Sequence, residues 1–331
     1  MLSIPTEWSF SFSGELAAFM LLLVFCVLAK LELIFPLAIS SANVRRHSYK
    51  ANLSLLLFNS MLISALSKLS LFSIARYFPV EGLLDYVNEG WWWGILEFVL
   101  LDLLLYLWHK ASHQLDHLWM FHRVHHNDPC LNLSTAFRVH CIELCIINSV
   151  KAIYIVVLGL DQMTVLINEF MSTLFVMFHH TNFKLKGERW LSLIIIVPSL
   201  HRTHHSVQRA EHDSNYGAVF SLWDRLFGTL LNLQPTEIGI KGKSPQQFMA
   251  LLRFGFALPS TSPLSTISTT LDLDHMIAEA AYYRAEKRDF RPGYELMDWL
   301  EAKKEILQLV YGNRSTMSNH LRQIRGIKSA V

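Results

Sequence analysis

Long apolar runs separated by short polar segments dominate the first 180 residues of the chain. An α-helix needs about 20 apolar residues to cross a bilayer. The last two runs are shorter and are separated only by Gly159-Leu160-Asp161, which predicts a tight helical hairpin, either two crossings or one re-entrant hairpin. We therefore predict an all-α integral membrane helical bundle with about four to five membrane helices. The runs are 15–38, 51–78, Trp91 towards Trp108, 142–160 and 162–179.

The charges between these runs predict how the bundle is oriented. Arg45, Arg46 and Lys50 follow the first run, whereas the segment after the second run carries acidic residues and no Lys or Arg. By the positive-inside rule the first of these segments faces the cytoplasm. Five crossings then place residues 109–140, and everything after residue 180, on the cytoplasmic side. There they would form a histidine-rich helical cap.

The composition supports a membrane protein and excludes several other classes. Hydrophobic residues make up 52% of the chain and charged residues 17%, whereas charged residues are about 25% of an ordinary soluble domain. A net charge of +2 gives no basic surface for nucleic acid. Four scattered cysteines do not form a disulfide framework or a cysteine-based zinc site. The start of the chain lacks the basic region of a cleavable signal peptide.

The 16 histidines are concentrated in three short motifs. HKASH covers 109–113, HRVHH covers 122–126 and HRTHH covers 201–205. Spacings of three and four residues place imidazoles on one face of a helix. Imidazole nitrogens are common ligands of first-row transition metals. One such ion takes about three to six ligands, so the eight imidazoles indicate two metals. A disordered histidine-rich tract is disfavoured because the motifs keep a fixed frame.

The three motifs and the segment EHDSNYGAVFSLWDRLFGTL that follows them resemble the fatty acid hydroxylase/sterol desaturase superfamily of membrane enzymes. The resemblance covers roughly residues 90–232. It implies a non-haem di-iron centre that uses O2 as co-substrate to hydroxylate or desaturate a C–H bond of a lipid. Substrates of fatty acyl, sterol-like or lipid head-group type all fit this resemblance, and no protein nucleophile is needed.

The resemblance also implies a set of site residues. The stretch FHHTNF supplies a further ligand at His180, because His180-Thr-Asn fits the family frame. Carboxylates and amides nearby are expected to orient the ligand imidazoles, with packing or capping of a turn as the alternative. The expected ligands are His109, His113, His122, His125, His126, His180, His201, His204 and His205, and the residues expected beside them, or as possible ligands, are His140, His179, Asp102, Asp213 and Asn215.

The remaining chain divides by composition. We predict a membrane di-iron oxygenase domain over 1–257, a Ser/Thr/Pro-rich linker over 258–270 and a helical hairpin over 271–331 that resembles the DUF2934 module of bacterial proteins. The hairpin favours a bacterial inner-membrane location. The sequence holds no haem-ligand HPGG and no GxGxxG. We therefore expect a separate electron donor, such as a ferredoxin, cytochrome or flavoprotein reductase.

One alternative belongs to a different class. The histidines could serve a membrane metal transporter or sensor without oxygenase activity. A transport path places its ligands within the membrane spans, whereas here they gather at one face.

Overall fold

The computed structural model describes residues 6–66, 70–77, 82–83, 86, 92–242, 245–257 and 269–311. The chain divides into two compact units, Met1–Leu258 and Pro259–Val331. Among the described residues the secondary structure is helical, with three isolated β-bridges and no strand, so the all-α prediction is confirmed. The predicted linker lies almost entirely outside the described residues, as do the acidic residues after the second apolar run.

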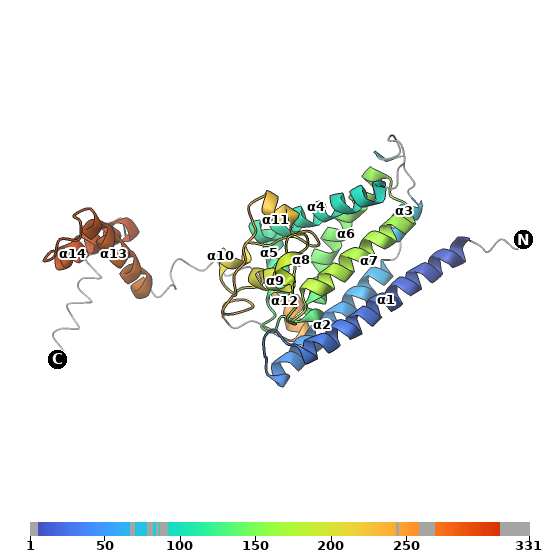
Figure 1. The fold of residues 1–331 in the computed structure, drawn as a ribbon, viewed down its shortest axis with the longest axis horizontal. Helices are drawn as coiled ribbons and strands as arrows, with labels where there is room; N and C mark the ends of the chain where they lie inside the picture. Colours follow the sequence, from blue (N-terminus) through green and yellow to red (C-terminus); the bar gives the residue numbers. More distant parts are fainter. Residues whose placement is uncertain are drawn as a thin grey trace, which may run out of the picture. The chain divides into compact units, whose positions relative to one another are not determined.

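The first unit is a bundle of long helices with most of the short helices at one end (Figure 1). The long helices are α1 (Thr6–Ile34), α2 (Ala42–Ala65), α4 (Trp93–Gln114), α6 (Cys141–Leu158) and α7 (Gln162–His179). The shorter helices are α3 (Leu71–Tyr77), α5 (Asp116–His126), the 3₁₀ helix Leu133–Phe137, α8 (Glu188–Leu191), α9 (Pro198–His204), α10 (Arg209–His212), α11 (Leu222–Leu226) and α12 (Phe248–Phe256).

The predicted hairpin of the last two apolar runs is present as α6 and α7. Gly159 ends α6 in the left-handed conformation with φ 78°, and Asp161 caps the start of α7 by accepting bonds from the amides of Met163 and Thr164. Glycine adopts that conformation without steric cost. The predicted run 51–78 is not one helix, because α2 ends at Ala65 and α3 begins at Leu71.

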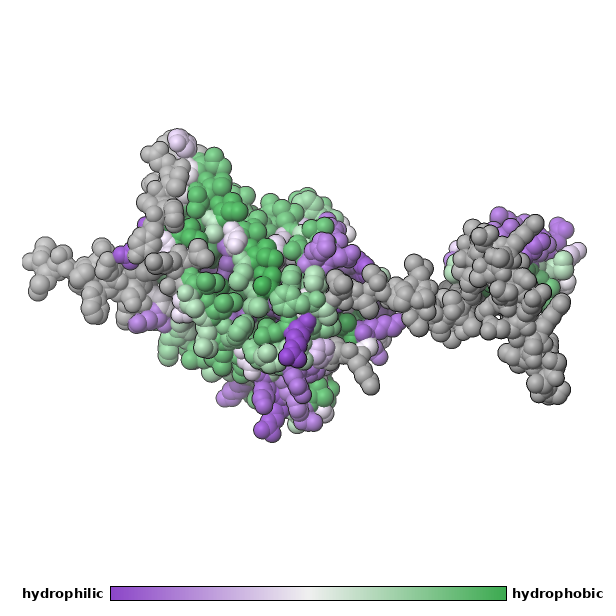
Figure 2. Space-filling view, turned by 180° about the vertical axis from the view of Figure 1, so that it is seen from behind, coloured by the Kyte–Doolittle hydropathy of each residue, from purple (hydrophilic) through white to green (hydrophobic). Residues whose placement is uncertain are grey.

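Apolar side chains cover much of the long helices (Figure 2). Large exposed hydrophobic residues include Phe19, Leu22 and Leu33 on α1 and Ile153 on α6. Two helical segments are long and apolar enough to cross a membrane by length and composition, Gly14–Ile34 and Cys141–Leu158. So much exposed apolar surface indicates that these helices contact something other than water.

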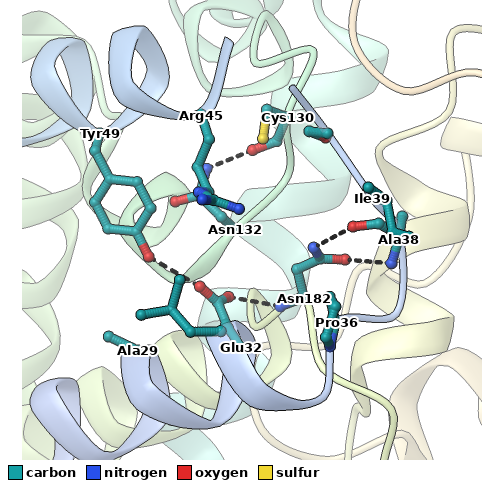
Figure 3. Close-up of a pocket in the computed structure, with 12 residues that line it drawn as sticks. Ala29, Glu32, Pro36, Ala38, Ile39, Arg45, Tyr49, Cys130, Asn132 and Asn182 are labelled. Carbon is teal, nitrogen blue, oxygen red and sulfur yellow. Dashed lines mark hydrogen bonds between the residues drawn. The ribbon is translucent and has the colours of Figure 1, made fainter. Parts of the chain in front are cut away.

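The carboxylate of Glu32 joins four parts of the first unit near the end of α1 (Figure 3). It accepts a hydrogen bond from Tyr49 Oη at 2.9 Å, from the amide of Leu133 at 2.7 Å and from the amide of Asn182 at 2.6 Å. The Asn182 side chain in turn bonds both backbone groups of Ala38. Glu32 is 8% exposed, so it links α1, α2 and the segment that follows α7 through buried polar bonds.

The second unit is a helical hairpin of α13 (Thr269–Glu286) and α14 (Glu295–Tyr311). Its core contains Ile277, Ala302 and Ile306, with Ala280, Ala281 and Trp299 packed against them. Leu296 and Leu300 of α14 are exposed.

Candidate metal centre

The structure brings all nine predicted ligand histidines together at one end of α4, α5 and α7 and on α9. They form two groups, and within each group the ligand atoms lie within 4.8 Å of one another. We call these groups the first cluster and the second cluster. The first cluster is His109, His113, His122, His126 and His204, and the second cluster is His125, His180, His201 and His205.

The two HRxHH motifs divide their histidines between the clusters in opposite ways. His122 and His126 of the first motif enter the first cluster, and His125 enters the second. In the second motif His201 and His205 enter the second cluster, and His204 enters the first. Residues i and i+4 stack on one helix face, and residue i+3 lies beside them. The three histidines of a motif therefore do not face a single ion.

The spacing of the ring nitrogens fits metal ligation. In the second cluster the Nε2 atom of His180 lies 3.1 Å from that of His125 and 2.9 Å from that of His201. In the first cluster the Nε2 atoms of His113 and His126 are 3.1 Å apart. Nitrogen ligands bind a first-row metal at about 2.0–2.1 Å, which puts neighbouring ligands about 3 Å apart. Each cluster thus has the dimensions of a coordination shell.

Backbone carbonyls hold three of the imidazoles in a fixed tautomer. A ring Nδ1–H that donates to a carbonyl leaves the Nε2 lone pair free for a metal. The Nδ1 atoms of His109, His180 and His204 lie 2.7–2.8 Å from the carbonyls of Tyr216, Val176 and Ser214 respectively.

Carboxylates hold two further imidazoles of the first cluster. His122 Nδ1 lies 2.6 Å from Glu143 Oε1, and His113 Nδ1 lies 3.2 Å from Asp213 Oδ1. A carboxylate on the far ring nitrogen fixes the ring and makes its other nitrogen a stronger donor. Asp213 is one of the residues that the sequence placed beside the ligands. Glu143 is not, because it lies in an apolar helix far from any histidine motif.

The free nitrogens provide an independent test of whether metals fit. Buried polar atoms almost always have a hydrogen-bond partner. Among the described residues, the buried Nε2 atoms of His109, His122 and His204 have none. All three belong to the first cluster, and their Nδ1 atoms are already bonded. A metal ion is the partner that these nitrogens lack, so the residues present fit the expected metals.

Burial favours the neutral form of several cluster imidazoles. It lowers the pKa of His126, His204 and His205 well below the ordinary value, and the neighbouring imidazoles lower it further. Only the neutral ring has the lone pair that binds a metal. The folded chain therefore presents its histidines in the metal-binding form.

His140 lies outside both clusters, which contradicts its assignment as a possible ligand. Its Nδ1 accepts a bond from the amide of Ile142 and so caps α6, and its Nε2 lies 3.0 Å from the carbonyl of Leu252 on α12. Both ring nitrogens are used, and an added Cβ on Gly255 would meet the ring at 2.4 Å. The ring therefore fastens α6 to α12.

Asp102 and Asn215 act through the backbone rather than on an imidazole. Asp102 accepts bonds from the amides of Val219 and Phe220 and from Trp223 Nε1. Asn215, at φ 53°, bonds the carbonyls of Leu200 and Leu231. Both residues fix the segment whose carbonyls bond His109 and His204. For Asn215, the alternative role of capping a turn therefore describes the structure better than a bond to a ligand imidazole.

His179 lies against the second cluster without joining it. Its ring centroid is 4.1 Å from that of His201 and 4.7 Å from that of His180. Of the pair in FHHTNF, it is therefore His180 that the structure places among the ligand nitrogens.

A cavity of about 330 Å³ adjoins both clusters. His109 and His122 of the first cluster and His125 and His180 of the second line it. Its other walls come mainly from α6 and α7, with apolar side chains such as Leu144, Ile147 and Val176. Ligand sites are typically concave and mostly apolar with a few polar groups. The arrangement is that of a helical protein with two metal-binding clusters open to an apolar cavity.

Comparison with known proteins identifies the domain. Residues 94–229 match the family model described as fatty acid hydroxylase. This segment contains α4 to α11 and all nine cluster histidines. This segment of the chain is therefore similar to the fatty acid hydroxylase family, which confirms the resemblance seen in the histidine motifs. Residues 272–308 match a second family, the protein of unknown function DUF2934.

Several curated proteins are similar to the first unit. The ornithine lipid hydroxylase OlsE of Rhizobium tropici is 32% identical over 166 residues, 49% of this chain and 50% of that protein. Alkylglycerol monooxygenase of Caenorhabditis elegans is 32% identical over 145 residues, 43% of this chain and 27% of that protein. A cholesterol 25-hydroxylase-like protein of Danio rerio is 27% identical over 136 residues, 40% of this chain and 53% of that protein.

The chain thus spans about half or less of the length of the curated relatives that it matches. No solved structure matches it.

Proposed function

We propose that this chain is a membrane-bound, O2-dependent lipid hydroxylase with a di-iron centre. The observation that carries the proposal is the pair of adjoining histidine clusters open to one apolar cavity. The names of the relatives support it, since each is a hydroxylase or monooxygenase and the substrates in these names include lipids. Hydroxylation is favoured over desaturation for the same reason.

In this proposal the first and second clusters hold one iron each. Bound iron supplies the activation of O2 for oxidation of a C–H bond. The protein contributes position and electrostatics. Glu143 and Asp213 hold His122 and His113, and the apolar walls of α6 and α7 exclude water from the cavity. Neutral imidazoles leave the metals their full positive charge, which stabilises reduced oxygen species.

The membrane arrangement belongs to the proposal. Two helical segments, Gly14–Ile34 and Cys141–Leu158, are long and apolar enough to cross a membrane. Helices α2, α4 and α7 belong to the same bundle (Figure 1). We propose four to five membrane helices with the histidine end on the cytoplasmic side of a bacterial inner membrane, because Arg45, Arg46 and Lys50 lie after the first span. Electrons would then come from a separate cytoplasmic donor.

Expression in a host with defined lipids, followed by lipid mass spectrometry, tests the activity. We expect a lipid that gains the mass of one oxygen in cells with the wild-type chain and not in cells with His125→Ala. Loss of two hydrogens would instead identify a desaturase. An unchanged lipidome in wild-type cells supplied with iron and a reductase system would contradict both.

The same protein, purified with excess ferrous iron, tests the centre. We expect about two irons per chain. A preparation that is folded but retains no iron would contradict the di-iron proposal and favour the transporter or sensor alternative.

A further inference from the structure

The catalytic cavity contains a second group of polar side chains, well away from the histidines. Lys151 of α6 and Glu169 of α7 line its wall and form an ion pair of 2.8 Å between Nζ and Oε1. Asn148, Ser172 and Thr173 line the same wall. Their neighbours Leu144, Ile147 and Val176 are apolar. We call Lys151, Glu169 and Ser172 the distal polar group.

The distance from the histidines follows from the helix rise. Lys151 lies eight residues after Glu143, which bonds His122, and Ser172 lies eight residues before His180. Eight residues of α-helix span about 12 Å. Two antiparallel helices thus bring polar residues to the same level, about 12 Å from the clusters.

The bonds within the distal polar group are incomplete. Ser172 is 5% exposed, and its Oγ has no hydrogen-bond partner among the described residues. Serine in a helix usually bonds a carbonyl four residues earlier. The ammonium of Lys151 has three donors, and one of them reaches Glu169. A buried polar group without a partner is costly, so the open bond of Ser172 indicates a ligand atom.

The charges narrow the kind of ligand. Lys151 and Glu169 neutralise each other, so a ligand with a net charge would leave an uncompensated charge at membrane depth. A plain alkyl chain would leave Ser172 and the remaining ammonium protons facing hydrocarbon. A neutral group that can donate and accept, such as a hydroxyl, satisfies Ser172, Lys151 and Glu169 together.

We propose that the distal polar group binds a neutral hydroxyl within the hydrocarbon part of the lipid substrate, about 12 Å from the bond that is oxidised. This inference rests on the proposed function, since it places the oxidised bond at the histidine clusters. It narrows the substrate class to lipids that already carry an oxygen function in the chain or ring.

A binding experiment on the full-length, iron-loaded protein in phosphatidylcholine nanodiscs tests the proposal. The probes are methyl octadecanoate and the same ester with a hydroxyl on its twelfth carbon. We expect wild-type protein to bind the hydroxy ester about three- to tenfold more tightly, which is the gain from one or two net hydrogen bonds. Equal affinity for the two esters would overturn the proposal.

Two variants assign the preference to these side chains. Ser172→Ala and the paired variant Lys151→Met/Glu169→Leu should each reduce the preference to less than twofold, with iron content unchanged. The paired variant removes both charges, so no single buried charge is left behind. Ser149→Ala is the matched control, because Ser149 is on α6 but bonds the carbonyl of Cys145 at an exposed position. A preference that survives in both variants would refute the assignment.

Mass spectrometry of the bound ester separates this inference from the proposed function. With O2 and a reducing electron donor added to the nanodiscs, a hydroxyl preference without gain of oxygen supports the distal site and counts against hydroxylase activity. Gain of oxygen without a hydroxyl preference supports the activity and contradicts the distal site.

Discussion

Each HRxHH motif supplies two histidines to one cluster and one to the other. His122 and His126 share the first cluster with His204, while His201 and His205 share the second with His125. Neither motif can complete a cluster alone, so α5 and α9 must lie together before either metal has its ligands. The repeated pentapeptide is therefore a reciprocal arrangement of ligands rather than a duplicated fold. This division predicts how single substitutions affect the metals.

Replacing one cluster histidine should affect one metal more than the other. We expect His126→Ala to lower the iron content from about two to about one per chain, because only the first cluster loses a ligand. His140→Ala should keep both irons and instead lower the melting temperature, since His140 caps α6 and bonds Leu252. Iron analysis and thermal denaturation of the two purified variants check this. If the folded His140→Ala variant lost iron, His140 would have to be a metal ligand.

Glu143 lies closer to a cluster histidine than Asp213 does, with its Oε1 2.6 Å from His122 Nδ1. Substitution of such a carboxylate typically weakens metal binding about 10–100-fold. We expect that loss for Glu143→Ala and a smaller loss for Glu143→Gln, whose amide oxygen can still accept. Competition for iron with a chelator measures it. Glu237→Gln, at an exposed position, is the control. Unchanged iron affinity in Glu143→Ala would contradict the role of this bond.

At the residue scale, the sequence predicted the ligand histidines. It did not predict the residues whose roles depend on tertiary contacts. The motif spacings and the family frame were enough to choose all nine cluster histidines, including His180 beside His179. Glu143 could not be predicted, because its bond joins residues 21 positions apart on different helices. Asp102 was expected beside the ligand histidines, but its oxygens bond the 219–223 segment, whose position depends on the fold.

At the scale of elements, polar bonds between helix ends determine where the clusters form. Glu32 holds the amide of Asn182, two residues after His180, and that of Leu133 in the 3₁₀ helix. The sequence showed Glu32 only as a charge in an apolar run. Its partners lie about 100 and 150 residues away along the chain, so no local pattern indicates them.

Glu32→Leu should therefore destabilise the first unit. It leaves the hydroxyl of Tyr49 and the amide of Asn182 without an acceptor (Figure 3), and the amide of Leu133 as well. Each unpaired buried group costs about 1–3 kcal/mol. We expect a clearly lower midpoint in thermal denaturation in detergent. Glu15→Leu, an exposed position on the same helix, should not lower it. Equal midpoints for the two variants would show that Glu32 contributes little.

At the scale of the whole molecule, hydropathy predicted a helical membrane protein. The described residues are helical, and apolar side chains cover much of the face of the long helices seen in Figure 2. The number of crossings is harder to read, because helices that carry functional polar groups lose hydropathy. Glu169 and Asn168 lie in α7, and Asp102, Lys110 and the HKASH histidines lie in α4. These polar groups face the cavity, the metal clusters or neighbouring segments, so a count based on apolarity alone underestimates such helices.

The two units should be separable in function. All nine cluster histidines and the cavity belong to Met1–Leu258, whereas the α13–α14 hairpin has its own core around Ile277, Ala302 and Ile306. We expect a chain that ends at Leu258 to bind about two irons and to oxidise lipid at a rate within about twofold of the full chain, a difference of under 0.5 kcal/mol.

Ala302→Asp in the full chain separates loss of the hairpin from loss of its fold. Ala302 is fully buried between α13 and α14, and an unpaired charge there should unfold the hairpin. If both variants keep iron and activity, the hairpin has a role outside the reaction, such as docking a partner. The other outcome is that the truncated chain keeps its iron, yet purified electron donor supports activity in the full chain alone. The hairpin would then take part in electron delivery.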